Sequence, residues 1–364
     1  MIHKKVALIS LIILFILSFI FFKDKIFLKT DFAKAEFVYS KSQYVLGDKK
    51  EITMSDELLY TYAAYRYLYG EDPTKINFEH PPLGKYLLGV SYAIFQNVST
   101  INIFLYFIFL FLFYSLSKIF IKSFAFRLIA LLVLLFMPIF REYAVISMLD
   151  IPLLTFTFLF FYSLFCIQSQ GQQIIFSGLA LGFYISTKYW FPSIFLLLLI
   201  AFIYFVNKKR LLSFVYSLII ALIIYLLSYT VYFINDPRPI DFLRFEWYRF
   251  RWWTGERTAP KFLIFSSLFL GKHKNWWAEG YTYQNYWTIL WPILFLVWCV
   301  AQFFTNKKLE FKLLNLFAFL MLLFYAFGAA SAGKYLLQII PIWIISSFAF
   351  IEAFFYKLDK QYEK

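Results

Sequence analysis

The chain has 364 residues, of which 62% are hydrophobic, 24% aromatic and only 15% charged, and its formal net charge is +14. Soluble globular proteins are typically about 45–50% apolar and about 25% charged, so this composition excludes a soluble enzyme, a disordered chain and a nucleic-acid-binding protein. Because Lys and Arg collect in the cytoplasmic loops of membrane proteins, the positive charge indicates membrane topology and no nucleic-acid partner.

Apolar runs of membrane-crossing length recur along the whole chain. A hydrophobic helix of about 20 residues crosses a bilayer. The first run follows a charged start and is not followed by a small-residue cleavage site, so we expect an uncleaved span with its N-terminus in the cytoplasm. The runs that we interpret as spans are 6–22, 101–121, 125–141, 151–167, 173–187, 190–206, 211–234, 286–304, 313–331 and 334–356.

Basic segments between these runs set the predicted topology. All of them can be cytoplasmic only if the shorter apolar run 83–97 does not cross, so we expect that run to form a helix at the outer interface. The sequence therefore predicts an all-α polytopic protein, a single membrane domain over 1–364 with about ten spans, both termini inside, and long outer segments at 23–100 and 235–285. The basic segments are 4–5, 118–127, 207–210, 305–312 and 357–364.

The first polar cluster on the predicted outer side opens a helix. Ser55-Asp56-Glu57 precedes a tyrosine-rich stretch that we expect to be helical to about Tyr69, with Gly70 ending it. Ser is a favoured N-cap and acidic residues in a first turn oppose the helix dipole, so a structural role explains the pair. A carboxylate at an outer membrane surface could equally serve as a general base, and the sequence leaves both interpretations open.

The next cluster is His80-Pro81-Pro82-Leu83-Gly84-Lys85. Two prolines end the preceding segment and favour a helix start, which places Lys85 in a first helical turn. The cluster is either a rigid corner with a lysine whose ammonium group reaches the interface, or part of a binding site.

Three further charged residues lie at predicted outer ends of spans. Asp150 directly precedes a span, as an N-cap or as the second carboxylate of a site that also contains Asp56. Lys188 and Lys334 stand beside aromatic residues, where a lysine is either an interface anchor or a ligand for an anion.

Two other patterns concern helix contacts. Gly178 and Gly182 are spaced by four residues and predict a small-residue face against another helix. In the outer segment 235–285, arginines alternate with Trp and Phe over 242–253, which suits a helix in the headgroup layer. These arginines are Arg244, Arg249 and Arg251, and they belong either to an interfacial belt or to a phosphate-binding surface.

Taken together, these motifs resemble the dolichyl-phosphate-mannose protein mannosyltransferase family and its GT-C glycosyltransferase relatives. The resemblance runs from about 55 to 195 and rests on Asp56-Glu57, the His80–Lys85 string, Met148-Leu-Asp150-Ile-Pro-Leu and Gly178-Leu-Ala with Thr187-Lys188-Tyr189-Trp190. It implies a GT-C-type bundle with juxtamembrane helices on the outer face. It also implies a multi-pass protein of the cell membrane, or of an equivalent membrane facing the endoplasmic reticulum lumen, with its active site on the outer face.

The resemblance also implies roles for individual residues. Asp56 matches the acidic residue of the first outer loop that serves as the base or orients the acceptor, and Glu57 is its neighbour. Asp150 matches the acidic residue of the second outer loop, and Lys188 the basic position beside the donor. Lys334 stands where relatives often have Arg before a proline.

The donor is expected to be a polyprenyl-phosphate-linked sugar, so no nucleotide is needed. Its phosphate is predicted to be held by cations at the outer ends of apolar runs, namely Lys85, Lys188 and Lys334, with His80 beside them. Some GT-C relatives add a divalent metal, for which His80, Glu57 and Asp150 could supply ligands, although the sequence shows no tight metal-ligand spacing. No other cofactor is expected.

The resemblance thus implies an inverting hexosyltransferase that moves mannose or another hexose from a dolichyl or other polyprenyl phosphate to an acceptor hydroxyl. The expected acceptor is a protein Ser or Thr; a glycolipid or cell-envelope acceptor is the alternative. A lipid or solute transporter would need mid-span polar groups or matched broken helices, and the sequence shows no internal repeat and few mid-span charges. A non-catalytic membrane assembly subunit is the remaining alternative.

Overall fold

The computed structural model describes residues 16, 20, 22–188, 191–206, 211–236, 238–255, 260–274, 280–304, 308–328 and 331–362, with side chains to 356 in the last segment. The predicted first span, 6–22, lies almost entirely outside these residues. The rest of the chain is mostly helical, which confirms the all-α polytopic membrane class.

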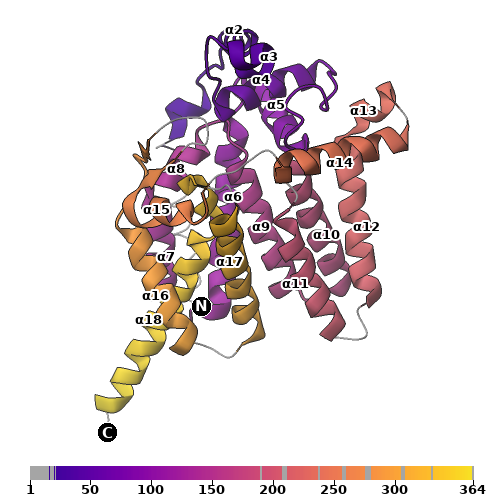
Figure 1. Ribbon diagram of the computed structural model, residues 1–364. Coiled ribbons are helices and arrows are strands. Elements are labelled where there is room, and N and C mark those ends of the chain that lie inside the picture. The colour runs from indigo at the N-terminus through magenta and orange to yellow at the C-terminus, as the bar shows by residue number, and fades with distance from the viewer. Residues whose placement is uncertain are drawn as a thin grey trace.

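Long apolar helices run side by side and form a bundle (Figure 1). By length and hydropathy, α6, α12 and α17 could each cross a bilayer, and the bent pair α7 and α8 could be a fourth crossing within the described part of the chain. The bundle helices are α6 (Thr100–Phe120), α7 (Phe124–Phe136), α9 (Asp150–Phe165), α10 (Gln170–Thr187), α11 (Ser193–Val206), α12 (Leu211–Ser228), α16 (Leu290–Phe304), α17 (Leu309–Phe327) and α18 (Ile340–Tyr362).

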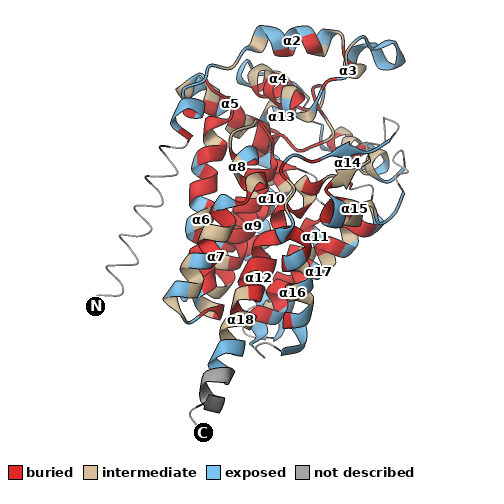
Figure 2. Ribbon diagram, turned by 90° about the vertical axis from the view of Figure 1, so that its left-hand side faces the viewer, coloured by how far each residue is buried: buried red, intermediate tan, exposed pale blue. Residues whose placement is uncertain are grey.

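One end of the bundle, which we name the cap end, carries the short elements (Figures 1 and 2). Helix α5 lies there beside α4, at the place where the sequence predicts a non-spanning helix. The cap-end elements are α2 (Phe32–Ser40), α3 (Gln43–Leu46), the 3₁₀ helix η1 (Gly47–Lys49), α4 (Asp56–Leu68), α5 (Leu83–Phe95), α8 (Pro138–Ala144), α13 (Thr230–Asn235), α14 (Pro239–Gly255), α15 (Leu263–Leu270), the strands β1 (Lys272–His273) and β2 (Thr282–Tyr283), and the 3₁₀ helix η3 (Gly333–Gln338).

Several predicted basic segments meet at the opposite end. The backbone N–H of Lys122, between α6 and α7, donates to Glu352 of α18 over 2.8 Å. The ammonium group of Lys308, just before α17, donates to the carbonyl of Ile119 over 3.3 Å. These contacts place Lys122 of the 118–127 segment against α18 at Glu352, and Lys308 of the 305–312 segment against the end of α6. Segments 4–5 and 207–210 lie outside the described residues.

Two predicted spans are broken. The run 125–141 divides into α7 and α8, which are bent by 59°. Pro138 begins α8 and has no N–H to continue the ladder of α7, so the helix axis changes there. The run 334–356 begins as η3, and α18 starts only at Ile340.

Helix α9 forms the centre of the bundle. Of its 16 residues, 13 are buried, including Asp150 at its first position. A helix that is apolar on all faces is expected to be enclosed by others, here α6 and α10 among them (Figure 2). The cap of α9 is Leu149, so the interpretation of Asp150 as an N-cap is wrong.

The predicted small-residue face of α10 is confirmed. A Cβ added to Gly178 would come within 2.8 Å of Ile220 Cβ, and one added to Gly182 within 2.7 Å of Ile224 Cδ1 and 3.0 Å of Ala221 Cα. The seam between α10 and α12 is polar as well, because Ser177 and Ser217 share a hydrogen bond of 3.0 Å.

We expect Gly182→Leu to destabilise the protein by about 1–3 kcal/mol, because the added side chain must separate α10 from α12. The measurement is the thermal unfolding midpoint of the purified protein in detergent. Gly171→Leu is the matched control on the same helix, since a Cβ there would meet no atom within 4 Å. Equal midpoints for the two variants would contradict this packing.

Candidate active site

Four of the predicted charged residues meet at the cap end as two ion pairs. Lys188 Nζ lies 2.8 Å from Asp150 Oδ1, and Lys334 Nζ lies 2.6 Å from Asp56 Oδ2. The partners are 38 and 278 residues apart in the chain. They come from the start of α4, the start of α9, the end of α10 and the beginning of η3.

The ring of Tyr335 joins the two pairs into one site. Its centroid lies 5.6 Å from Lys188 Nζ and 5.7 Å from Lys334 Nζ, so the two ammonium groups are at most 11.3 Å apart. Cations within about 6 Å of a ring centroid are attracted by the aromatic face. We name Asp56, Asp150, Lys188, Lys334 and Tyr335 the paired-charge site.

The two pairs differ in exposure. The side chains of Asp150 and Lys188 are only 5% and 2% exposed, whereas Asp56 is 43% exposed. Asp150 Oδ2 is buried and has no hydrogen-bond partner among the described residues. Burial opposes the charged form of Lys334, but the carboxylates of Asp56 and Asp150 outweigh it and raise the pKa of Lys334 above its ordinary value. Asp56 is therefore the carboxylate of the site that a reactant can reach.

Hydrogen bonds tie the start of α4 to the turn before α9. Ser147 Oγ lies 2.7 Å from Thr61 Oγ1 and donates to the carbonyl of Glu57 over 3.0 Å. The Asn102 amide donates to the carbonyls of Ile146 and Met148, each over 2.8 Å. The carboxylates of Asp56 and Asp150 are thus carried by elements that are fixed to each other.

Helix α4 begins and ends as the sequence predicts. Ser55 is its cap, with Oγ accepting from the Leu58 N–H over 3.4 Å, and Gly70 follows its end with φ +77°. Glu57 is exposed at the start of α4, and partial desolvation by the surrounding protein raises the pKa of its carboxyl group, while the Lys34 ammonium group opposes the rise.

Lys85 holds the turn before α5 together. Its fully buried ammonium group donates to Asn77 O over 2.9 Å, Asn77 Oδ1 over 3.0 Å and His80 O over 2.8 Å. A lysine ammonium group has three hydrogens, so these acceptors use its whole donor capacity. To contact a donor phosphate, as predicted, Lys85 would have to release one of them.

The His80 ring stacks on Trp253 of α14, with centroids 5.2 Å apart, and lies 5.9 Å from Tyr60. Trp253 Nε1 also donates to the carbonyl of Glu79 over 2.8 Å. Helix α14 is therefore docked on the turn that contains His80.

Gly84 lets the His80–Lys85 motif pack closely against the residues that precede the buried ion pair of Asp150 and Lys188. A Cβ there would come within 2.9 Å of Leu149 Cδ2 and 3.0 Å of the Thr187 carbonyl oxygen. These two residues directly precede Asp150 and Lys188 in the chain. The close approach of α5 thus supports both members of the buried pair.

The arginines of α14 are mostly engaged with the protein. Arg249 is buried and donates to the hydroxyls of Tyr225 and Tyr229 and to Glu246. Arg244 pairs with Asp241 over 2.9 Å on the surface. Of the three predicted arginines, Arg249 therefore stabilises the junction between α12 and α14.

The predicted metal ligands are not assembled. Within the described part of the chain, no three His, Cys, Asp or Glu side chains come together in a way that could hold a metal ion. Asp150 is paired with Lys188 and His80 is stacked on Trp253. His80, Glu57 and Asp150, which the sequence offers as possible ligands, thus form no metal-binding group within the described residues.

Sequence analysis missed the tyrosines of the site. Tyr60 is fully buried, and burial, together with the Asp56 and Asp150 carboxylates, raises its pKa well above the usual value. The rings of Tyr143 and Tyr286 meet edge to face at 5.7 Å. The only sequence signal was the high aromatic content, which does not distinguish these tyrosines from those facing lipid.

No protein-family model matches the chain, and no curated protein sequence matches it. Among solved structures, the chain is similar to ArnT from Cupriavidus metallidurans in the apo state, with a TM-score of 0.57 and 15% identity over 81% of this chain. It is also similar to the same protein bound to undecaprenyl phosphate, with a TM-score of 0.55 and 16% identity over 87% of this chain.

These matches show the fold. The chain has the GT-C-type membrane fold of ArnT, and the matches do not point to the protein mannosyltransferase family. The chain spans 55% and 58% of the two ArnT chains, a little over half of their length.

Proposed function

We propose that the protein is a glycosyltransferase that uses a polyprenyl-phosphate-linked sugar and inverts the anomeric carbon. The observation that carries the proposal is the paired-charge site: one exposed carboxylate lies beside cations at one end of a GT-C-type bundle. The bound undecaprenyl phosphate of ArnT supports a polyprenyl phosphate as the lipid. We further propose that the cap end faces outward, because the basic segments collect at the opposite end.

The proposed reaction is a single displacement. The acceptor hydroxyl oxygen attacks the anomeric carbon on the face opposite the phosphate, and its proton passes to Asp56. The bond between that carbon and the phosphate oxygen breaks, and the electron pair leaves with the polyprenyl phosphate. A positioned base typically contributes about 10²–10⁴-fold to the rate.

The two lysines stabilise the leaving group in this mechanism. Charge accumulates on the phosphate in the transition state, and preorganised cations lower the barrier where such charge develops. Lys334 is the more accessible cation, at 15% side-chain exposure against 2% for Lys188. We assign direct contact with the donor phosphate to both lysines. Lys334 reaches the phosphate from the more exposed pair, and Lys188 reaches it on the side of the site where its ammonium group lies against the Tyr335 ring.

The sugar and the acceptor are the finer part of the proposal. We propose mannose or another hexose as the sugar and a protein Ser or Thr hydroxyl as the acceptor, following the sequence motifs at Asp56, His80–Lys85 and Asp150. The test incubates the purified protein with radiolabelled mannosyl or glucosyl undecaprenyl or dolichyl phosphate, and with peptide or lipid acceptors. Absence of label transfer from every polyprenyl-phosphate hexose, by a protein that binds undecaprenyl phosphate, would contradict the proposed sugar class.

We expect Gly84→Ala to weaken undecaprenyl phosphate binding severalfold, because relief of the clash must displace the backbone at Thr187 and with it Lys188. Binding to the detergent-solubilised protein is the measurement. Gly89→Ala is the control on the same helix: its Cβ would come within 2.9 Å of the Ala64 carbonyl oxygen, away from the site. Equal losses in both variants would reduce the role of Gly84 to general packing.

A further inference from the structure

Gln338, at the end of η3, is the centre of a buried hydrogen-bonded cluster, and its side chain is only 4% exposed. The Tyr184 hydroxyl of α10 donates to Gln338 Oε1 over 3.0 Å. The Thr157 hydroxyl of α9 shares its hydrogen between this oxygen, at 3.3 Å, and the carbonyl of Leu153, at 2.9 Å. Gln338 Nε2 donates to the Tyr325 hydroxyl of α17 over 3.4 Å. One side-chain amide therefore joins η3 to α9, α10 and α17.

Two of these helices carry the buried ion pair of the paired-charge site. Tyr184 lies four residues before Lys188, which caps α10, so the two residues are about one helical turn apart. Thr157 lies seven residues after Asp150 on α9, which corresponds to about two turns on the same face. The hydrogen bonds to Gln338 are therefore made on the same helices as the pair, one or two turns away from it.

The element η3 carries the rest of the cation arrangement. Gln338 follows Lys334 by four residues and Tyr335 by three. In a 3₁₀ helix, side chains three residues apart lie on the same face, so Gln338 and Tyr335 share one face of η3. The ring of Tyr325 lies against the ring of Tyr335, with centroids 5.2 Å apart. The cluster thus holds the aromatic ring that both ammonium groups of the site contact.

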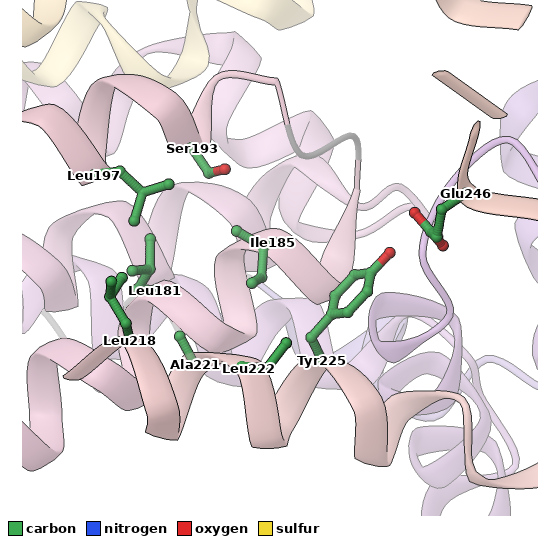
Figure 3. A pocket seen from close by; sticks show the side chains of 9 residues that line it. All are labelled: Leu181, Ile185, Ser193, Leu197, Leu218, Ala221, Leu222, Tyr225 and Glu246. Carbon is green, nitrogen blue, oxygen red and sulfur yellow. The ribbon is translucent and has the colours of Figure 1, made fainter. Parts of the chain in front are cut away.

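Another face of α10 lines a cavity. Leu181 and Ile185 face a space of about 430 Å³ that is bounded by α11 and α12 (Figure 3). Side chains that line a cavity have fewer packing partners on that side. The hydrogen bond of Tyr184, on the neighbouring face of α10, therefore contributes more to fixing the end of the helix that carries Lys188.

We propose that Gln338 is a positioning residue, which keeps α9, α10 and η3 in one register and so places the two lysines against the Tyr335 ring. Fully satisfied buried polar networks specify a single arrangement of the elements that they join, which apolar contacts alone do less strictly. With the register kept, Lys188 and Lys334 can meet the same donor phosphate. This consequence for the donor rests on the proposed function.

The first test is Gln338→Leu in the purified full-length protein in detergent. Leu has about the size of Gln but neither donates nor accepts a hydrogen bond. We expect kcat/KM for the polyprenyl-phosphate sugar to fall about 10²-fold, because a displacement of about 1 Å remote from the chemistry can have that effect. Tyr184→Phe removes one hydroxyl and keeps the ring, so it should fold normally and give a smaller loss in the same direction. Wild-type kcat/KM in both variants would overturn the proposal.

Asn315→Leu is the matched control, because Asn315 is an equally buried amide away from the site, also 4% exposed. Its Oδ1 accepts from Trp298 Nε1 over 2.6 Å and from Ser346 Oγ over 2.7 Å, which joins α17 to α16 and α18. We expect Asn315→Leu to lower the thermal unfolding midpoint about as much as Gln338→Leu does, and yet to keep nearly the wild-type kcat/KM. Equal losses of kcat/KM in the two variants would reduce Gln338 to a packing residue.

A second measurement does not depend on sugar transfer. Lysines are modified with an amine-reactive acetylating reagent and the modified sites are read by mass spectrometry. We expect Gln338→Leu to raise the modification of Lys188 and Lys334 severalfold, and Asn315→Leu to leave it unchanged. If the wild-type protein transfers no sugar and binds no undecaprenyl phosphate, the proposed function fails, and this labelling alone decides whether Gln338 positions the lysines. Labelling of both lysines at the wild-type level in Gln338→Leu would show that it does not.

Discussion

Asp56→Asn is expected to lower turnover by about 10²–10⁴-fold while the protein stays folded. The amide has the size of the carboxylate and can still accept a hydrogen bond from Lys334, but it cannot accept the proton of the acceptor hydroxyl. Asp56 is 43% exposed, so loss of its ion pair should change the free energy of unfolding by only about 0–1 kcal/mol. The measurement is the rate of sugar transfer at saturating donor, with donor binding measured separately.

Glu57→Gln is the matched control for this variant. Glu57 is the next residue on α4, and its side chain points about 100° away from that of Asp56 around the helix axis. The two carboxylates therefore cannot both accept the proton of the same acceptor hydroxyl. Desolvation raises the pKa of the Glu57 carboxyl group, and a raised pKa favours proton acceptance by a general base. Glu57 is therefore the carboxylate most able to compete with Asp56 for this role. A Glu57→Gln protein that is inactive beside a nearly normal Asp56→Asn protein would transfer the role of base to Glu57.

Charge patterning along the sequence predicted which residues share one end of the bundle. Alternation of basic loops places Asp56, Asp150, Lys188 and Lys334 on one side, and in the structure they meet there. Their pairing was not predictable, because Lys334 reaches Asp56 across 278 residues and no local pattern encodes that contact. The shared ring of Tyr335 is likewise a product of tertiary packing.

Motif spacing did not reveal what each motif residue contacts. Lys85 was predicted at a phosphate, yet its ammonium group is enclosed by Asn77 and His80 oxygens. Backbone carbonyls are invisible in a sequence motif, so their competition for a lysine cannot be foreseen. The bend at Pro138 is the opposite case, since proline in an apolar run predicts a break and we nevertheless interpreted 125–141 as one span.

The buried pair of Asp150 and Lys188 is expected to give the largest effect on stability. Lys188→Met should destabilise the protein by about 3–5 kcal/mol, because it leaves the Asp150 carboxylate buried without its cation. Asp150→Asn combined with Lys188→Met removes both charges and should recover much of that loss. Thermal unfolding of the single and double variants in detergent measures both effects. Equal unfolding midpoints for the wild-type protein and Lys188→Met would show that the pair is not buried.

The same double variant separates the structural role of Lys188 from its proposed role at the donor phosphate. If Lys188 contacts the phosphate, the double variant should unfold nearly as the wild-type protein does and still bind undecaprenyl phosphate at least about tenfold more weakly, because a hydrogen bond to a charged group is worth about 1.5–3 kcal/mol. If Lys188 serves only to neutralise Asp150, recovery of stability should restore binding too. Wild-type affinity for undecaprenyl phosphate in the stable double variant would therefore leave Lys334 as the phosphate-binding cation of the site and reduce Lys188 to the partner of Asp150.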